Sequence, residues 1–466
     1  MEQSIGTMLP LYSVLPFVGM LLSIALGPVL FPKLWHHHFG KVSAGWAALL
    51  AIPLIIAYGK LGVDELLHLL IIDYIPFIIL IGSLFTVGGG ILVRTTLKGT
   101  TWVNAGFLTV GAIIASWMGT TGAAMLLIRP FLRVNKDRKY RAFMVVFFIF
   151  MVANVGGALT PLGDPPLFLG FLHGVPFFWT LRLIVPMAVV LLGLLLTYIA
   201  FDKYYLAKEQ KEGSLGLVSS NGERIESQSI SASTAKGKKL EILGSQNFVL
   251  LAVIIGVILF SGYVKMSEVS LLGVHVGWQD IIRNLALVVI IVISMKITPK
   301  AVREENEYSW GPILEIVYLF FGIFVTMAPV LAILKAGESG ALSFITAAVE
   351  EPAQYFWITG ALSSFLDNAP TYLTFFSTAL GQFYPGMSEA PAVAQFLIDQ
   401  PIYLMAISAG SVFFGAVTYI GNAPNFMVRS IAEESGVKMP SFFGYMAYSI
   451  CILLPLFALV TWLFFI

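Results

Sequence analysis

Residues 154–166 read Asn-Val-Gly-Gly-Ala-Leu-Thr-Pro-Leu-Gly-Asp-Pro-Pro and interrupt a long apolar segment. Glycine and proline disfavour the helix interior, so this stretch predicts a helix that unwinds for a few residues. Asp164 then stands as the N-cap of a restarted helix, with proline at its first position. Residues 415–426 read Gly-Ala-Val-Thr-Tyr-Ile-Gly-Asn-Ala-Pro-Asn-Phe and predict the same break, with Asn422 as N-cap. The chain is therefore expected to contain two broken helices, at about 141–171 and 402–428.

The surroundings of both breaks are too apolar for a soluble protein. Of 466 residues, 58% are hydrophobic and 11% are charged, whereas soluble chains have roughly 45–50% and about 25%. The formal net charge of +1 gives no electrostatic case for nucleic acid. The single cysteine, Cys451, excludes an internal disulfide and cysteine-rich metal sites. The composition predicts an all-α polytopic membrane protein.

A membrane-spanning helix needs about 20 mostly apolar residues, and ten segments qualify as full or near-full spans. They lie at about 9–31, 43–59, 66–93, 141–171, 178–201, 247–264, 281–296, 311–334, 402–428 and 441–466.

Two further apolar stretches, at about 102–134 and 355–380, are interrupted by Gly119-Thr120-Thr121-Gly122 and by Asp367-Asn368-Ala369-Pro370. A straight crossing would leave these polar tips in hydrocarbon, where unsatisfied backbone groups cost several kcal/mol. We therefore expect each stretch to form a re-entrant helical hairpin that is buried in protein.

The distribution of Lys and Arg predicts the orientation of these hairpins. The flanks of the first, 94–101 and 129–141, hold eight basic residues, whereas the flanks of the second, 335–354 and 381–401, hold Lys335 alone. Basic residues concentrate on the cytoplasmic side, so the two hairpins should open on opposite sides. The Ser-, Lys- and Glu-rich segment 202–245 becomes a flexible cytoplasmic linker. Both termini fall outside, no removable signal peptide is expected, and the predicted location is the bacterial cytoplasmic membrane.

The two halves, 1–201 and 246–466, repeat the same motifs in the same order. Ser116 aligns with Ser364 at an offset of 248 residues, and Gly157 aligns with Gly415 at an offset of 258. Each half contains a span, a hairpin, a broken span and a span, in opposite orientations. Matching interrupted segments in inverted halves indicate the midplane site of a transporter.

Asp164 and Asp367 are the two acids at interruptions that should lie at membrane depth. A charge there costs at least about 2.5–3.5 kcal/mol, so each needs a cation, a proton or strong hydrogen bonds. Unwound carbonyls suit a cation and restarted helix N-termini suit an anion, so the geometry permits either substrate. We expect Na⁺ at Asp164, Asp367, Asn368 and Asn422, supported by hydroxyl and amide oxygens of Ser116, Thr120, Thr121, Asn154, Thr160, Ser363, Ser364, Thr371, Thr418 and Asn425.

Other polar residues have simpler explanations. Asp73 and Glu315 are expected at the membrane interface, and His36-His37-His38 in a wet interfacial loop. A membrane enzyme using His173 or this tract has no supporting catalytic pairing. We expect no enzymatic activity and no cofactor other than a transported or coupling ion.

With its Asn154–Pro166 and Ser364–Pro370 motifs, the chain resembles the ion transporter superfamily, and within it the ArsB/NhaD-type permeases. The resemblance implies a homodimer of subunits with scaffold and transport domains, the latter moving to alternate access. The sodium-coupled dicarboxylate branch has Ser-Asn-Thr at both hairpin tips, which this chain lacks. The resemblance thus favours Na⁺/H⁺ antiport, with Na⁺-coupled transport of a carboxylate or oxyanion as the alternative.

Overall fold

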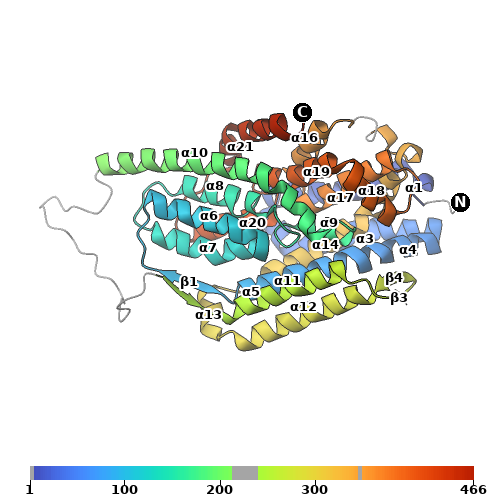
Figure 1. Cartoon of the computed structure of the whole chain (residues 1–466), viewed down its shortest axis with the longest axis horizontal. Coiled ribbons are helices and arrows are strands. Elements are labelled where there is room, and N and C mark those ends of the chain that lie inside the picture. The colour runs from blue at the N-terminus through green and yellow to red at the C-terminus, as the bar shows by residue number, and fades with distance from the viewer. Residues whose placement is uncertain (1–4, 213–239, 345–348) are drawn as a thin grey trace, which may run out of the picture.

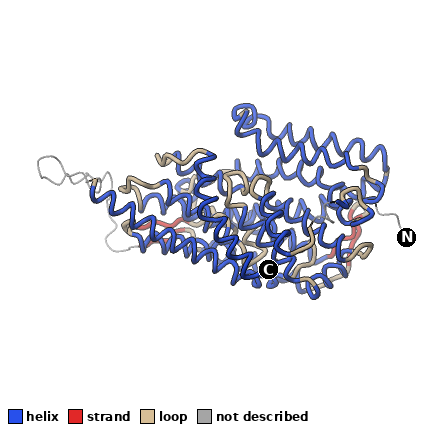
Figure 2. The backbone as a smooth tube through the Cα atoms, turned by 90° about the horizontal axis from the view of Figure 1, so that it is seen from above, coloured by secondary structure: helices blue, strands red, loops and turns tan. Residues whose placement is uncertain are grey.

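The computed structural model describes residues 5–212, 240–344 and 349–466. The described residues are mostly helical, and most of the long helices run roughly along the long axis of the molecule (Figures 1 and 2). Two short antiparallel strand pairs lie at opposite ends of the bundle: β1–β2 at one end and β3–β4 at the other. We call these the β1 end and the β3 end.

The first helices pack against one another, and α4, η2 and α5 follow without a break. The η2 segment is a π-helix, in which the hydrogen-bond ladder is widened locally. The bounds of these elements are α1 Ile5–Met8, η1 Leu11–Val14, α2 Leu15–Leu30, α3 Pro32–Tyr58, α4 Lys60–His68, η2 Leu69–Tyr74, α5 Ile75–Gly88 and β1 Leu92–Thr95.

The next helices contain the first hairpin stretch and the first break. Helices α6 and α7 lie side by side (Figure 1) and are separated by Gly119 alone. The bounds are α6 Thr101–Met118, α7 Thr120–Val134, α8 Ala142–Met151, η3 Val155–Gly157, α9 Pro165–Leu172, η4 Phe177–Leu183 and α10 Ile184–Lys211.

The second half begins with β2, which pairs with β1. Helices α5, α11 and α12 lie together along one edge of the molecule (Figure 1). The bounds are β2 Leu240–Leu243, α11 Gln246–Tyr263, β3 Glu268–Leu271, β4 Val274–Gly277, α12 Trp278–Ile297, α13 Lys300–Glu305, α14 Gly311–Lys335 and η5 Gly337–Ser339.

The last helices contain the second hairpin stretch and the second break. Helices α16 and α17 pack against each other and against α19. The bounds are α16 Pro352–Ser363, α17 Asn368–Phe383, α18 Glu389–Asp399, α19 Pro401–Phe414, α20 Ala423–Glu434 and α21 Phe442–Phe464.

Within the described residues, eight helices are long and apolar enough to cross a membrane, or nine if α18 and α19, bent by 99°, form one span. This agrees with a polytopic membrane protein. The predicted span at 281–296 is the helix α12, but it carries Asp280, Arg283 and Lys296 and is not among the eight. Helix α6 is among them, although the sequence predicts it as one arm of a hairpin.

Two predictions of local structure differ from the described residues. The predicted linker 202–245 is ordered at both ends, because α10 continues to Lys211 with Asp202 and Glu209 fully buried, and because residues 240–243 form β2. Residues 213–239 of this linker lie outside the described residues. The histidine tract 36–38 is helical, not a loop, because α3 begins at Pro32, a residue whose fixed φ suits a helix start.

Candidate functional site

The two breaks lie where the sequence predicts them. Helix α8 ends at Met151 and α9 restarts after Asp164, which has extended backbone angles (φ −144°, ψ 143°). Helix α19 ends at Phe414 and α20 restarts after Asn422, with nearly the same angles (φ −153°, ψ 138°). Each break brings a polar N-cap residue into the centre of the helix bundle.

Two glycines allow the first break to pack tightly on the tip of the first hairpin. A Cβ on Gly163 would lie 2.1 Å from the carbonyl oxygen of Gly157, so only glycine fits there. Gly119, between α6 and α7, has φ of +84°, which favours glycine. The backbone N–H of Thr120 donates to the Gly163 carbonyl at 2.8 Å. The hairpin tip and the broken helix are thereby joined directly.

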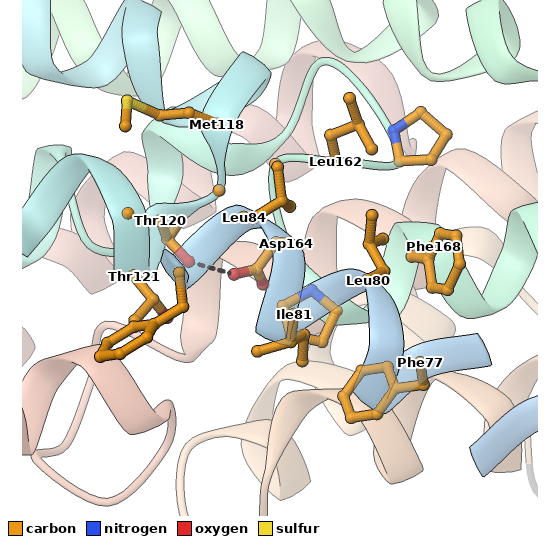
Figure 3. Close-up of a pocket in the computed structure, with 16 residues that line it drawn as sticks. Phe77, Leu80, Ile81, Leu84, Met118, Thr120, Thr121, Leu162, Asp164 and Phe168 are labelled. Carbon is orange, nitrogen blue, oxygen red and sulfur yellow. Dashed lines mark hydrogen bonds between the residues drawn. The ribbon is translucent and has the colours of Figure 1, made fainter. Parts of the chain in front are cut away.

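The carboxylate of Asp164 is the centre of the site. It is 2% exposed and points towards Thr120, whose hydroxyl donates to Oδ1 at 3.0 Å (Figure 3). The amide of Asn422 also donates to Oδ1, at 3.1 Å, and the amide of Asn368 donates to Oδ2. Three neutral donors from three distant segments therefore converge on one buried carboxylate.

These donors bring four helix N-termini to the same point. Thr120 and Asn368 are the first residues of α7 and α17, and Asp164 and Asn422 are the N-caps of α9 and α20. The positive ends of four helix dipoles therefore surround the Asp164 carboxylate.

A second layer of amides supports Asn422. Its side-chain NH₂ also contacts Oδ1 of Asn154 at 3.2 Å, and the NH₂ of Asn154 donates to Asn425 at 2.7 Å. Asn425 in turn donates to the carbonyls of Gly415 and Thr418. The chain of amides links the two breaks, because Asn154 lies in the first and the other residues lie in or beside the second.

Four of the other predicted hydroxyls join the hairpin tips to the broken helices, whereas the hydroxyl of Ser364 donates to the Gly360 carbonyl one turn earlier, at 2.9 Å. Thr160 donates to the Ser116 carbonyl, and Thr418 donates to the Ser364 carbonyl. Ser116 donates to Gly156 at 2.5 Å, and Ser363 donates to Ser411 at 2.6 Å. These four side chains use their hydroxyl hydrogens in structural hydrogen bonds.

Asp367 is placed differently from Asp164. It is half-buried and caps its own helix by accepting from Ala369 N at 3.2 Å, while its carbonyl accepts from Thr371 at 2.9 Å. It makes no hydrogen bond with Asp164, although the two carboxylates lie within electrostatic range. The structure thus brings Asp164 together with Asn368, the neighbour of Asp367.

Beside Asp164 lies a small cavity with a polar and an apolar wall (Figure 3). Thr120, Thr121 and Asp164 contribute the polar atoms. The opposite wall is apolar and comes from α5 and the start of α9, with Phe77, Leu80, Ile81, Leu84 and Phe168. The polar side of the cavity therefore faces apolar side chains of α5 and of α9, the helix that Asp164 caps.

Sequence reasoning missed a second set of buried charges. Asp73, predicted at the interface, is fully buried, and its Oδ1 lies 2.9 Å from Nε2 of His173. Glu389 contacts the other ring nitrogen of His173. The position of Asp73 within an apolar segment could have indicated that it is buried. Nothing in the nearby sequence indicated that His173 and Glu389 would be its neighbours. Glu315 is exposed, as an interfacial residue would be.

Multiple candidate spans around a buried carboxylate and four helix N-termini are typical of a polytopic membrane transport protein. Residues 6–465 match a family model described as "Putative citrate transport", and the chain belongs to this family. A search of curated proteins found no match. The match supports a transporter of the ion transporter type, while the finer resemblance to the ArsB/NhaD-type permeases stays a prediction.

Proposed function

We propose that the chain is a secondary transporter that moves citrate or a similar carboxylate together with cations. The family match favours a carboxylate substrate over the Na⁺/H⁺ exchange that the motif resemblance favours. The observation that carries the proposal is the meeting of four helix N-termini at the buried carboxylate of Asp164.

The charge balance of this site explains why cations should accompany the substrate. Four helix N-termini supply about +2 elementary charges in total. When both are ionised, Asp164 and Asp367 together carry about the same negative charge, so the site is then close to neutral. A carboxylate anion would then meet no net attraction in a poorly solvated region. Bound cations would make the site positive and allow the anion to enter.

Asn368 is the best-supported cation ligand. It is fully buried, its NH₂ donates to Asp164, and its Oδ1 has no hydrogen-bond partner within the described part of the chain. A buried amide oxygen without a partner costs free energy unless a donor or cation occupies its lone pairs. We assign Na⁺ as the candidate ion, with Asp164, Asn368, Asn422 and Asp367 as the surrounding oxygen-bearing residues. A proton on Asp164 is the alternative coupling ion.

The two halves form an inverted repeat whose hairpins and breaks move together. Thr160 bonds to Ser116 in the first half, and Thr418 bonds to Ser364 in the second. In the alignment of the halves, Thr160 corresponds to Thr418 and Ser116 corresponds to Ser364, so the two bonds are equivalent. This pairing supports two equivalent hairpin–break units in one transport domain, moving against a scaffold that includes α5 and α14. We further propose a homodimer in the bacterial cytoplasmic membrane, with the basic β1 end inside.

Uptake into proteoliposomes tests the function. We expect labelled citrate to accumulate when an inward Na⁺ gradient is imposed, and not with an equal K⁺ gradient. Accumulation driven only by an inward proton gradient would replace Na⁺ by H⁺ as the coupling ion. A Na⁺-driven pH change without any organic anion, together with no citrate accumulation, would contradict the proposal in favour of antiport.

Asp164→Asn tests the site. We expect citrate uptake to fall at least about 100-fold, because loss of a buried charge contact is worth about 3–5 kcal/mol. Asp137→Asn is the matched control, since Asp137 is exposed in the turn after α7, and it should transport normally. Both variants should elute as native protein in size-exclusion chromatography. Native uptake by Asp164→Asn would place the site elsewhere.

A further inference from the structure

Four alternating charges form a continuous chain near the β3 end, away from the Asp164 site. Asp73 Oδ1 lies 2.9 Å from His173 Nε2, Glu389 contacts His173 Nδ1, and Lys335 Nζ lies 2.6 Å from Glu389 Oε2. The four residues come from four separate elements: η2, the end of α9, the end of α14 and the start of α18. We call this set the charge chain.

The charge chain connects two groups of helices. Asp73 and Lys335 belong to a first group, in which α2, α3, α4, η2 and α14 pack together, and α14 of this group also packs along α17 of the second. His173 and Glu389 belong to a second group, in which α9, α17, α18 and α19 pack together. Two of the three ion pairs, Asp73–His173 and Lys335–Glu389, therefore cross from one group to the other. The third, His173–Glu389, lies within the second group.

At the buried end of the charge chain, Asp73 and His173 attract each other through their charges and not through aligned hydrogen bonds. Asp73 is fully buried and His173 is 9% exposed. Although the Asp73–His173 contact is close, neither Asp73 oxygen makes an aligned hydrogen bond within the described residues. Asp73 also sits in the π-helix η2, a local distortion that often marks functional positions. The negative charge of Asp73 is balanced by His173, which belongs to the second helix group.

We propose that the charge chain is a latch that holds the two helix groups in the conformation described here and must open in each transport cycle. Breaking the two crossing pairs leaves Asp73 with Lys335 on one group and His173 with Glu389 on the other. Each separated surface then keeps one positive and one negative charge, so no net charge is stranded. This inference rests on the proposed function, because it assumes that the groups move relative to each other.

The charges facing the latch keep His173 protonated. Burial alone lowers the pKa of His173, but the charges of Asp73 and Glu389 and its contacts with them raise it to about 10. Glu65 and His68 of α4 also lie within electrostatic range of the chain. A raised pKa means that the contribution of His173 is complete below its ordinary pKa and is lost as pH rises through about 10. The latch should be closed at neutral pH.

Distance measurements between spin labels test the latch. One label is placed at Leu272, in the exposed turn between β3 and β4, where β4 packs against α4 of the first group, and the other at Ile398, exposed on α18 of the second group. The exposed native Cys451 is first replaced by serine. In the otherwise native protein we expect one dominant distance at pH 7. Asp73→Asn should raise the population of a second distance at least about tenfold, since an unpaired buried charge is strongly unfavourable.

Three further variants make the result specific. Glu389→Gln, at the more exposed end of the chain, should act in the same direction even if Asp73→Asn folds poorly. The double variant Asp73→Asn/His173→Gln should shift the population no further than the larger single change, because the two residues act through each other. Arg429→Gln removes an ion pair with Glu433 inside α20 and should leave the distances unchanged.

The pH profile separates a latch from a general structural role. The second distance should grow in the native protein only as pH approaches about 10, and Asp73→Asn should move this transition to lower pH. A single unchanged distance in Asp73→Asn and Glu389→Gln would overturn the latch. Because this measurement needs neither citrate nor Na⁺, its failure is distinguishable from failure of the uptake experiment.

Discussion

Asp164 accepts hydrogen bonds from three side chains that lie far apart in the sequence, and none of these donors is charged. A hydrogen bond to a charged group contributes about 1.5–3 kcal/mol, so the donors hold the carboxylate without neutralising it. The carboxylate thus stays available to a cation or a proton, which a lysine or arginine partner would exclude. Asp367, at the neighbouring helix cap, adds negative charge without sharing these donors.

Adjacent threonines provide a matched test of this arrangement. Thr120 donates to Asp164 at 3.0 Å, whereas Thr121 lines the same cavity and makes no side-chain hydrogen bond with the described residues. We expect Thr120→Val to lower citrate uptake about 10- to 100-fold, as loss of one charge-assisted hydrogen bond predicts. Thr121→Val should remain within about twofold of native, since no bond is lost. Equal effects in initial-rate measurements would mean that the hydroxyl of Thr120 has no special role.

The broken helices present their N-termini at the centre of the bundle because each break is closed by a hairpin tip. Thr120 N bonds to Gly163 O at 2.8 Å, so the first tip satisfies a backbone carbonyl that the break exposes. Hydroxyl bonds from Thr160 and Thr418 repeat this closure in both halves. Irregular backbone at membrane depth is tolerated only when protein satisfies it in this way.

Gly163→Ala tests how tightly the first break is closed. The added Cβ would meet the Gly157 carbonyl at 2.1 Å, and overpacking of this kind costs about 1–3 kcal/mol. We expect a lower apparent Tm in detergent and strongly reduced uptake. Gly45→Ala is the control, because a Cβ there meets nothing within 4 Å and alanine favours the helix α3. If Gly163→Ala is as stable as Gly45→Ala, the backbone of the break can shift to accommodate the added Cβ.

Two sets of ion pairs join distant parts of the sequence, and they differ in how deeply they are buried. At the β1 end, Arg138 lies 2.6 Å from Glu209 and 3.0 Å from Asp202, and all three residues are buried. Arg129 also pairs with Glu307 at 2.6 Å, but the Glu307 side chain is 65% exposed. Buried pairs are costly to break singly, whereas exposed pairs contribute little. The Arg138 cluster therefore ties the loop after α7 firmly to α10.

Two arginine substitutions compare these environments. Arg138→Gln should leave two buried carboxylates without their cation and destabilise the protein by about 3–5 kcal/mol. Arg129→Gln should cost no more than about 1 kcal/mol. Thermal unfolding followed by tryptophan fluorescence measures both. Similar apparent Tm values for the two variants would show that water reaches the Arg138 cluster.

Local composition was enough to locate most of the long apolar helices and the residues at which helices are interrupted, because apolar length, glycine and proline act within a few residues of themselves. It also singled out Asp164, since an isolated acid in an apolar segment is costly wherever the chain folds. Composition failed at the described ends of the predicted linker, which belong to α10 and β2, and at the histidine tract, which belongs to α3.

Tertiary packing alone decided which side chains meet. Asn368, not Asp367, contacts Asp164, because the first turn of α17 points its first residue inward and leaves its cap at the edge. Asp73, His173, Lys335 and Glu389 are separated by up to 316 residues and become partners only when two helix groups pack together. Pairing across such distances depends on the relative placement of helices, which hydropathy and spacing along the chain do not encode.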